Sequence, residues 1–291
     1  MQNNDKNVAH YVWWMFAPLI IIVVLQNLID FFAMELLIVW NLATYKSGTF
    51  LELMNSWLQQ ATSPAFLTWV YVVYAVAAAA IFLYLYRKSF TTNGPEVWHN
   101  PFKGIADNVP LMLLGCLLFI IGMYYVSDML LESMAMVNTQ WLTDYEATLS
   151  QMDFSSPVAA LCIVIFAPIA EETALRGICF ASARKIMPAG WAIAMQALLF
   201  GALHMNMLQS AYAFVLGLGL GYVMYRYNNL LVVIILHMGF NLVGSLGAAY
   251  IPVPDGSNPI IWFLWLLGAL VVTYGAILLL KHSAPGVKVS D

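Results

Sequence analysis

Long apolar stretches alternate with short polar connections along the whole chain. Eight of these stretches have about the length, roughly 20 residues, that a helix needs to cross a bilayer. They lie at residues 15–38, 65–86, 109–131, 157–182, 189–208, 210–226, 230–250 and 260–280. The pattern predicts an all-α, polytopic membrane protein with about eight transmembrane helices. Only Met205 to Gln209 separate the fifth stretch from the sixth, so these two are also compatible with one tight helical hairpin.

The composition agrees with a membrane protein and excludes other classes. Of the 291 residues, 9% are charged and 62% are hydrophobic, and the net charge is −4. Soluble domains carry about 25% charged residues, so this chain could not cover a water-soluble globule with solvated side chains. The high hydrophobicity excludes intrinsic disorder, and the acidic balance excludes a nucleic acid as partner.

The basic residues predict the orientation, because Lys and Arg near the ends of spans are retained on the cytoplasmic side. If both termini are cytoplasmic, one of the 11 basic residues, Lys46, lies outside and Arg176 lies within a span. The cytoplasmic segments then hold Lys6, Arg87, Lys88, Lys103, Arg184, Lys185, Arg226, Lys281 and Lys288. We therefore expect both termini in the cytoplasm. No small-residue cleavage pattern follows the first apolar run, which predicts an uncleaved first helix.

A few polar side chains lie inside the predicted spans, where lipid would surround them. A charge at the bilayer centre costs at least about 2.5 kcal/mol, so such groups face the protein interior and usually mark a functional site. They are Glu171, Glu172, Arg176, His204, His237 and Asn241. All of them fall within 157–250, which we expect to be the catalytic helical core. It follows an N-terminal part with three helices and an outer loop (1–156) and precedes the last helix and a cytoplasmic tail (251–291).

The spacing of these residues indicates which of them share a helix face. Glu172 and Arg176 stand at i and i+4, where the carboxylate can neutralise the guanidinium. Glu171 points about 100° away from Glu172 and is left free. Phe200 and His204 share the same spacing, as do the histidine and asparagine of the seventh span.

Depth in the membrane allows the polar residues to meet. At 1.5 Å per residue, they lie roughly 11 to 22 Å from the cytoplasmic ends of their helices, so they can converge on one pocket. Arg176 lies nearer to the cytoplasmic surface, at about 12 Å, which favours a pocket that opens inward.

This set of side chains is suited to peptide-bond hydrolysis without a covalent intermediate. A glutamate beside a histidine can serve as a general base toward water. A second histidine with an asparagine can donate hydrogen bonds to the oxyanion that forms. There is no GxSxG motif for a serine nucleophile. Two histidines and a glutamate could instead bind zinc, but there is no HExxH and the histidines lie on different spans. We expect no cofactor, with a divalent metal such as zinc as the open alternative.

Three short motifs resemble those of the CPBP family, which comprises type II CAAX prenyl endopeptidases and bacterial bacteriocin-processing or immunity-type (Abi) membrane proteins. EETALRG, from Glu171, resembles the EExxxR motif of this family, FGALH the FxxxH motif and HMGFN the HxxxN motif. They occur in the family's order over about residues 157–250. The resemblance implies an intramembrane endopeptidase in a bacterial cytoplasmic membrane, acting on a membrane-associated peptide or protein.

The resemblance also implies roles for individual residues. Glu171 would activate water with the help of His204, and His237 with Asn241 would stabilise the oxyanion. Glu172 and Arg176, with Phe200 of the second motif, would organise the site or engage the substrate.

Two other functions are compatible with the same sequence. The first is a non-catalytic membrane scaffold or bacteriocin-immunity-type protein that keeps the fold and binds a partner. The second is a proton- or ion-coupled transporter, for which buried Glu and His are also expected. Against a transporter, the chain has no evident internal repeat with interrupted spans in matching positions.

Overall fold

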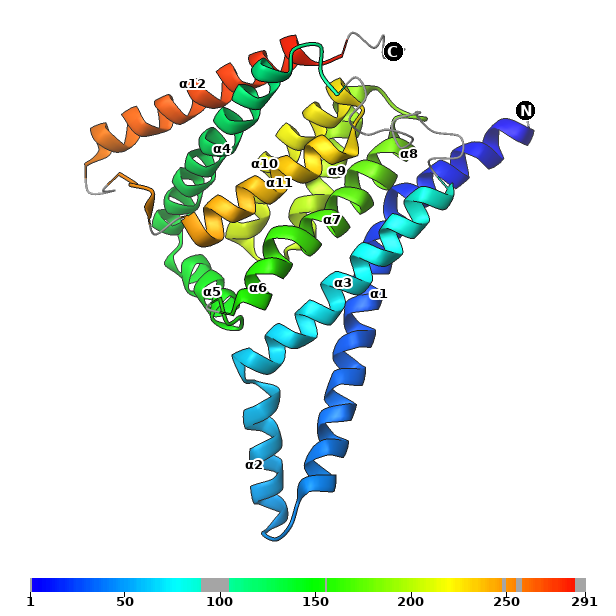
Figure 1. Cartoon of the computed structure of the whole chain (residues 1–291), viewed down its shortest axis with the longest axis vertical. Helices are drawn as coiled ribbons and strands as arrows, with labels where there is room; N and C mark the ends of the chain where they lie inside the picture. Colours follow the sequence, from blue (N-terminus) through cyan, green and yellow to red (C-terminus); the bar gives the residue numbers. More distant parts are fainter. Residues whose placement is uncertain (1, 90–104, 155, 248–249, 255–257, 286–291) are drawn as a thin grey trace.

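A computed structural model describes residues 2–89, 105–154, 156–247, 250–254 and 258–285, and all regular elements within these ranges are helices (Figure 1). The α-helices are α1 (Gln2–Thr44), α2 (Phe50–Ala61), α3 (Pro64–Ser89), α4 (Val109–Val137), α5 (Thr139–Ser150), α6 (Pro157–Leu161), α7 (Ala167–Glu172), α8 (Ala181–Ala183), α9 (Ala189–Leu203), α10 (Met207–Tyr227), α11 (Leu230–Leu242) and α12 (Pro259–Ser283). Three segments are π-helical: η2 (Cys162–Phe166), η3 (Thr173–Phe180) and η4 (Val243–Gly247).

The predicted polytopic, all-helical membrane fold is confirmed, although the spans differ in length. In the described ranges, six helices are long and apolar enough to cross a bilayer. The predicted fifth and seventh spans are shorter apolar helices, Ala189–Leu203 and Leu230–Ser245. The start of α1 and the end of α12 lie at the same end of the bundle (Figure 1), which we call the terminal end. The opposite end, where α5 lies, is called the α5 end.

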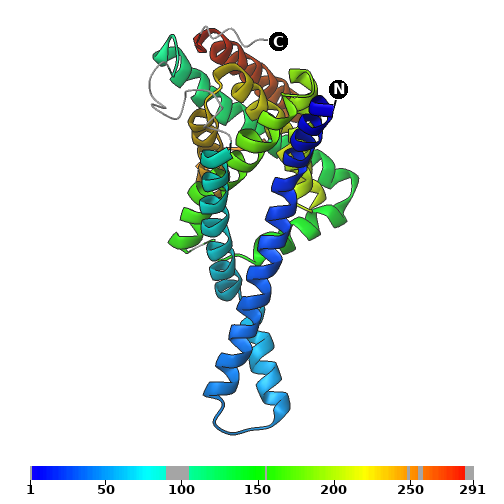
Figure 2. The ribbon, with the colours of Figure 1, turned by 90° about the vertical axis from the view of Figure 1, so that its right-hand side faces the viewer.

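The first helix is much longer than the predicted span 15–38. Its 43 residues extend about 64 Å, roughly twice the thickness of a hydrocarbon core. Its second half and α2 form an antiparallel hairpin that projects from the bundle at the α5 end (Figures 1 and 2). The side-chain amides of Asn41 and Gln60 bond reciprocally across this hairpin, at 3.3 and 3.1 Å. Thr49 and Glu52 form a capping box that starts α2. An apolar pattern identifies only the segment that lipid can surround. It therefore did not predict the extension of α1 beyond residue 38 or the 12-residue helix α2.

The fourth span is the central helix of the bundle and is not a regular α-helix. It runs continuously from Pro157 to Ala183 and is α-helical and π-helical in turn. Pro168 lies near its middle, and proline has no N–H to donate to the preceding turn. π-Helical turns such as those of η2 and η3 are frequent at functional sites. All residues of η3 are buried, so this part of the helix is enclosed on every side.

Small residues bring α9 and α10 into close contact. A Cβ atom on Gly217 would lie 3.0 Å from the Cα of Ala197. A Cβ atom on Gly201 would lie 2.6 Å from the carbonyl oxygen of Ser210. These two helices therefore form the tight hairpin that their short connection allows.

We expect Gly201→Ala to lower the stability of the protein, because the new methyl group would collide with backbone that cannot rotate away. Overpacking of this kind costs about 1–3 kcal/mol. Gly275→Ala on α12 is the matched control, since its Cβ would meet no atom within 4 Å. Thermal unfolding in detergent measures both variants. Equal midpoints for the two would contradict the close contact of α9 with α10.

Candidate active site

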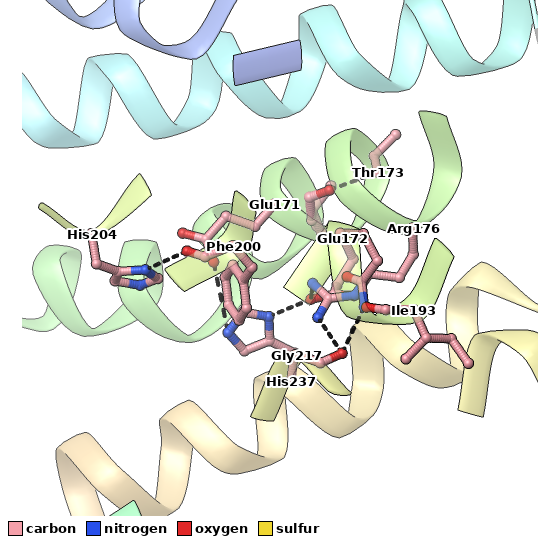
Figure 3. Close-up of polar contacts among 11 residues, drawn as sticks. Glu171, Glu172, Thr173, Arg176, Ile193, Phe200, His204, Gly217 and His237 are labelled. Atoms are coloured by element: carbon pink, nitrogen blue, oxygen red, sulfur yellow. Dashed lines mark hydrogen bonds and ion pairs between the residues drawn. The ribbon is translucent and has the colours of Figure 1, made fainter. Parts of the chain in front are cut away.

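A fully buried ion pair lies at the centre of the bundle. Arg176 Nη1 lies 2.8 Å from Glu172 Oε1, and both side chains have no exposed surface. Arg176 Nη2 also donates to the carbonyl oxygen of Gly217 on α10, at 3.3 Å. The i, i+4 pairing expected from the sequence is thus present, and it links the central helix to α10 (Figure 3).

His237 on α11 contacts both glutamates of the central helix. Its Nδ1 lies 2.7 Å from Glu172 Oε1, and its Nε2 lies 3.7 Å from Glu171 Oε2. The Glu172 carboxylate is already paired with Arg176, so it accepts hydrogen bonds. His237 Nδ1 therefore carries a proton and donates a hydrogen bond to Glu172. Glu172 therefore sets the tautomer of His237, and Nε2 is directed toward Glu171.

Glu171 differs from its neighbour in its surroundings. Its side chain is 27% exposed, whereas that of Glu172 is completely buried. Among the described residues, no group forms a hydrogen bond with its carboxylate, since the contact with His237 is too long for one. In the view of Figure 3 its carboxyl group lies between the rings of His204 and His237. Glu171 is thus a partly exposed carboxylate that does not share the ion pair of Glu172, as the 100° offset between the two side chains predicts.

His204 is held by the backbone of its own helix. It is the C-cap residue of α9, and its Nδ1 lies 2.9 Å from the carbonyl oxygen of Phe200. A carbonyl oxygen can only accept, so Nδ1 donates, and Nε2 is then the acceptor nitrogen of the neutral ring. The side chain is partly accessible.

Phe200 connects the histidines with the arginine. Its ring centre lies 5.1 Å from that of His204 and 5.5 Å from that of His237, both edge to face. The guanidinium carbon of Arg176 lies 4.7 Å from the same ring centre, a cation–π distance. This buried ring therefore separates the two imidazoles by a fixed distance and covers the ion pair.

Asn241 lies one turn beyond His237 on α11. Its Nδ2 donates to the carbonyl oxygen of Ile163 in η2, at 2.9 Å. This bond uses one of its two amide hydrogens and ties α11 to the π-helical part of the central helix. The second amide hydrogen remains available.

Arg176 is enclosed by the bundle and does not border an accessible space. Arg176 has no exposed surface, and all residues from Glu172 to Phe180 are buried. The position of a residue along its helix gives its depth in the membrane. It does not indicate which neighbouring helices bury that residue.

Several polar residues at the site were not singled out from the sequence. Gln196 on α9 is fully buried and donates to the carbonyl oxygens of Gly217 and Ile193. Its spacing offered a signal, because Gln196 stands four residues before Phe200 on the same face as His204. Tyr71 and Tyr212 also lie near Glu171, but tyrosines in an apolar span are readily assigned to the membrane interface.

We also tested whether the site residues fit a metal. In the part of the chain that the structure describes, no group of three or more His, Cys, Asp or Glu side chains is placed to hold one ion. His237 directs one ring nitrogen to Glu172 and not to the pocket. As arranged, these residues do not form a zinc ligand set.

Comparison with known proteins agrees with the motifs. Residues 153–243 match the family described as type II CAAX prenyl endopeptidase Rce1-like. No curated protein and no solved structure matches the chain. The matched region contains the central helix and α9 to α11, and with them Glu171, Glu172, Arg176, Phe200, His204, His237 and Asn241. The match over residues 153–243 therefore supports the resemblance to the CPBP family and indicates, at family level, a CAAX-type intramembrane protease.

Proposed function

We propose that the protein is an intramembrane endopeptidase in which Glu171 and His204 activate a water molecule. The observation that carries the proposal is the contrast between two adjacent carboxylates. Glu172 is neutralised by Arg176, whereas Glu171 has no hydrogen bond among the described residues and is partly accessible. A general base needs a free electron pair and room for its water, and Glu171 meets both conditions.

In the proposed reaction, Glu171 takes a proton from water while the water oxygen bonds to the carbonyl carbon of the substrate. The carbonyl oxygen becomes an oxyanion. When the C–N bond breaks, the leaving nitrogen takes the proton from Glu171. His204 is proposed to hold the water through its free Nε2, which can accept a hydrogen bond.

His237 is proposed to stabilise the oxyanion as an imidazolium. Its Nδ1 donates to Glu172, so Nε2 can donate only if the ring carries a second proton. Glu171, Glu172 and Arg176 together carry one negative charge, and a protonated His237 would bring the sum to zero. Glu172 then supports the imidazolium from behind, as a carboxylate does in hydrolase triads. The second amide hydrogen of Asn241 can contribute to the same oxyanion.

No cofactor enters this mechanism, so we expect chelators to leave cleavage unchanged. The purified protein would be dialysed against EDTA or 1,10-phenanthroline, and its rate on a peptide substrate would be compared with that of an untreated sample. A thermolysin-type zinc protease assayed in parallel is the control for chelation. Loss of activity that zinc restores would contradict the metal-free proposal.

The products test the function itself. Cells that produce the wild-type chain or Glu171→Gln would be compared by mass spectrometry of the ends of membrane and secreted peptides. We expect a set of new peptide ends only with the wild-type chain. Identical sets of ends would instead favour a non-catalytic binding scaffold.

We further propose that the protein lies in a bacterial cytoplasmic membrane with both termini in the cytoplasm. The support is the distribution of basic residues, together with the position of the start of α1 and the end of α12 at one end of the bundle (Figure 1).

A further inference from the structure

Two amide side chains lie in the middle of the longest apolar stretch of the protein. Gln26 and Asn27 are at the centre of Val8–Thr44, the part of α1 that is apolar enough to cross a bilayer. Both residues are exposed. Asn27 Nδ2 donates to the carbonyl oxygen of Val23 in the same helix, at 2.8 Å. Within the described ranges, no hydrogen bond joins either amide to another helix.

Lipid chains cannot pair with these amides. A side-chain amide has two hydrogens to donate and an oxygen that accepts, and Asn27 uses one of its hydrogens within α1. Hydrocarbon offers neither a donor nor an acceptor, so a polar group that faces it is left unpaired at a cost in free energy. In membrane proteins, Asn and Gln side chains form hydrogen bonds between helices. The two exposed amides therefore indicate that another protein helix covers this face of α1.

The face of α1 that carries Asn27 has the residue spacing of a helix-pairing seam. Five exposed side chains follow one another at alternating intervals of three and four residues, which we call the α1 seam: Trp13, Phe16, Ile20, Val23 and Asn27. Its four apolar members are between 42 and 57% exposed. This spacing is that of the a and d positions of a heptad repeat, with Asn27 at an a position. The seam extends about 21 Å, most of the roughly 30 Å of a hydrocarbon core, and the charge of Asp30 ends it.

The opposite face of α1 packs against the rest of the bundle. Met15 and Ile22 are buried in the hydrophobic core, and α1 contacts α3, η3 and α8. Ile22 and Asn27 point about 140° apart around the helix, as 3.6 residues per turn requires. Helix α1 lies at the edge of the bundle in both views (Figures 1 and 2). The α1 seam is therefore directed away from the other helices of the described chain.

We propose that the α1 seam pairs with the α1 seam of a second copy of this chain, around a two-fold axis perpendicular to the membrane. Copies with the same topology place equal residues at the same depth, so Asn27 meets Asn27. An amide is its own complement, because the free hydrogen of each Asn27 can donate to the oxygen of the other. An asparagine at one a position fixes the register of a paired seam and favours two strands. A partner of another kind would need a polar group at this depth, which a second copy supplies by symmetry.

The pairing can be measured by energy transfer between donor-labelled and acceptor-labelled copies of the full-length protein in liposomes. We expect transfer to rise with the protein-to-lipid ratio for the wild-type chain. Asn27→Leu is expected to raise the dissociation constant about threefold to tenfold, the effect of an interhelical hydrogen bond in a membrane. Ile20→Trp adds bulk to the seam and should raise it as well. Leu270→Trp on α12 is the matched control, since Leu270 and Ile20 are both 49% exposed, and it should leave the dissociation constant unchanged.

Disulfide cross-linking in native membranes locates the contact. We expect Val23→Cys to give a covalent dimer on oxidation, because a seam residue lies opposite its own copy across the two-fold axis. Leu270→Cys is the control on α12, where a residue of similar exposure should give no dimer. The wild-type chain, which has three free cysteines, is the blank.

A wild-type chain that is monomeric at every protein-to-lipid ratio would overturn the proposal, as would an unchanged dissociation constant for Asn27→Leu. Cross-linking of Leu270→Cys in place of Val23→Cys, or of Val23→Cys to a different protein, would also overturn it. Thermal unfolding identifies a seam variant that misfolds, and cross-linking of Val23→Cys then decides. None of these measurements depends on catalysis. The pairing would therefore stand even if the Glu171→Gln comparison disproved the protease function.

Discussion

Replacement of Glu171 by glutamine is expected to lower the rate of peptide cleavage by about a thousandfold, within the range of 10²–10⁴ that general-base catalysis contributes. Glutamine has the same shape but cannot take a proton from water. Its amide can still fill the partly exposed space that the carboxylate occupies. The fold should be preserved, because within the described ranges the Glu171 side chain forms no hydrogen bond that the change would remove.

The measurement is single-turnover cleavage of a peptide substrate by protein reconstituted in liposomes, with thermal unfolding as a check on the fold. Glu35→Gln is the matched control, since it is the same substitution at an exposed position on α1. Cleavage by Glu171→Gln at the wild-type rate would disprove the role of Glu171. A loss of activity accompanied by unfolding would leave the catalytic assignment unsupported.

Replacement of Arg176 by methionine is expected to cause the largest loss of stability, about 3–5 kcal/mol, because it leaves a buried carboxylate without its counter-charge. Glu172 has no exposed surface, so water cannot take the place of the guanidinium. Gly217 also loses the donor that Arg176 supplies to its carbonyl oxygen. Methionine keeps a long apolar side chain beside Phe200, which limits the cavity.

Thermal unfolding in detergent would measure this loss. Arg184→Met is the control, because Arg184 is partly exposed and contributes a ring contact with Tyr225 and a long hydrogen bond. Such a surface change should cost no more than about 1 kcal/mol. The double variant Glu172→Gln, Arg176→Met removes both charges and should recover part of the lost stability. If the double variant is less stable than Arg176→Met, charge compensation is not the reason for the loss.

Local patterns in the sequence were sufficient to predict much of the fold. A stretch of about 20 apolar residues has a stable position only across a bilayer, so composition along the chain locates the spans. The same reasoning does not predict helices that lie outside the bilayer-spanning segments. Helices α2 and α5 have 12 residues each and lie outside the predicted spans. They form through capping by Thr49 and Asn138 and through contacts with α1 and α10. Such contacts are absent from a local pattern.

The candidate site divides in the same way. The pairing of Glu172 with Arg176 follows from i, i+4 spacing, because a helix brings these positions together in any context. The bond from His237 to Glu172 crosses 65 residues, and that from Asn241 to Ile163 crosses 78. No periodicity predicts these contacts, since they depend on how α11 packs against an irregular helix.

Amino-acid order alone is enough to establish a membrane protein, its helical spans, and a set of polar side chains that lipid could not accommodate. These properties depend on the free energy of transfer between water and lipid and on the 3.6-residue repeat, which are both local. The tertiary structure decides which carboxylate is completely buried and which is partly exposed, and which histidine contacts both of them. Those properties depend on packing between helices that are far apart in the sequence. The sequence of one helix does not determine which other helices pack around it.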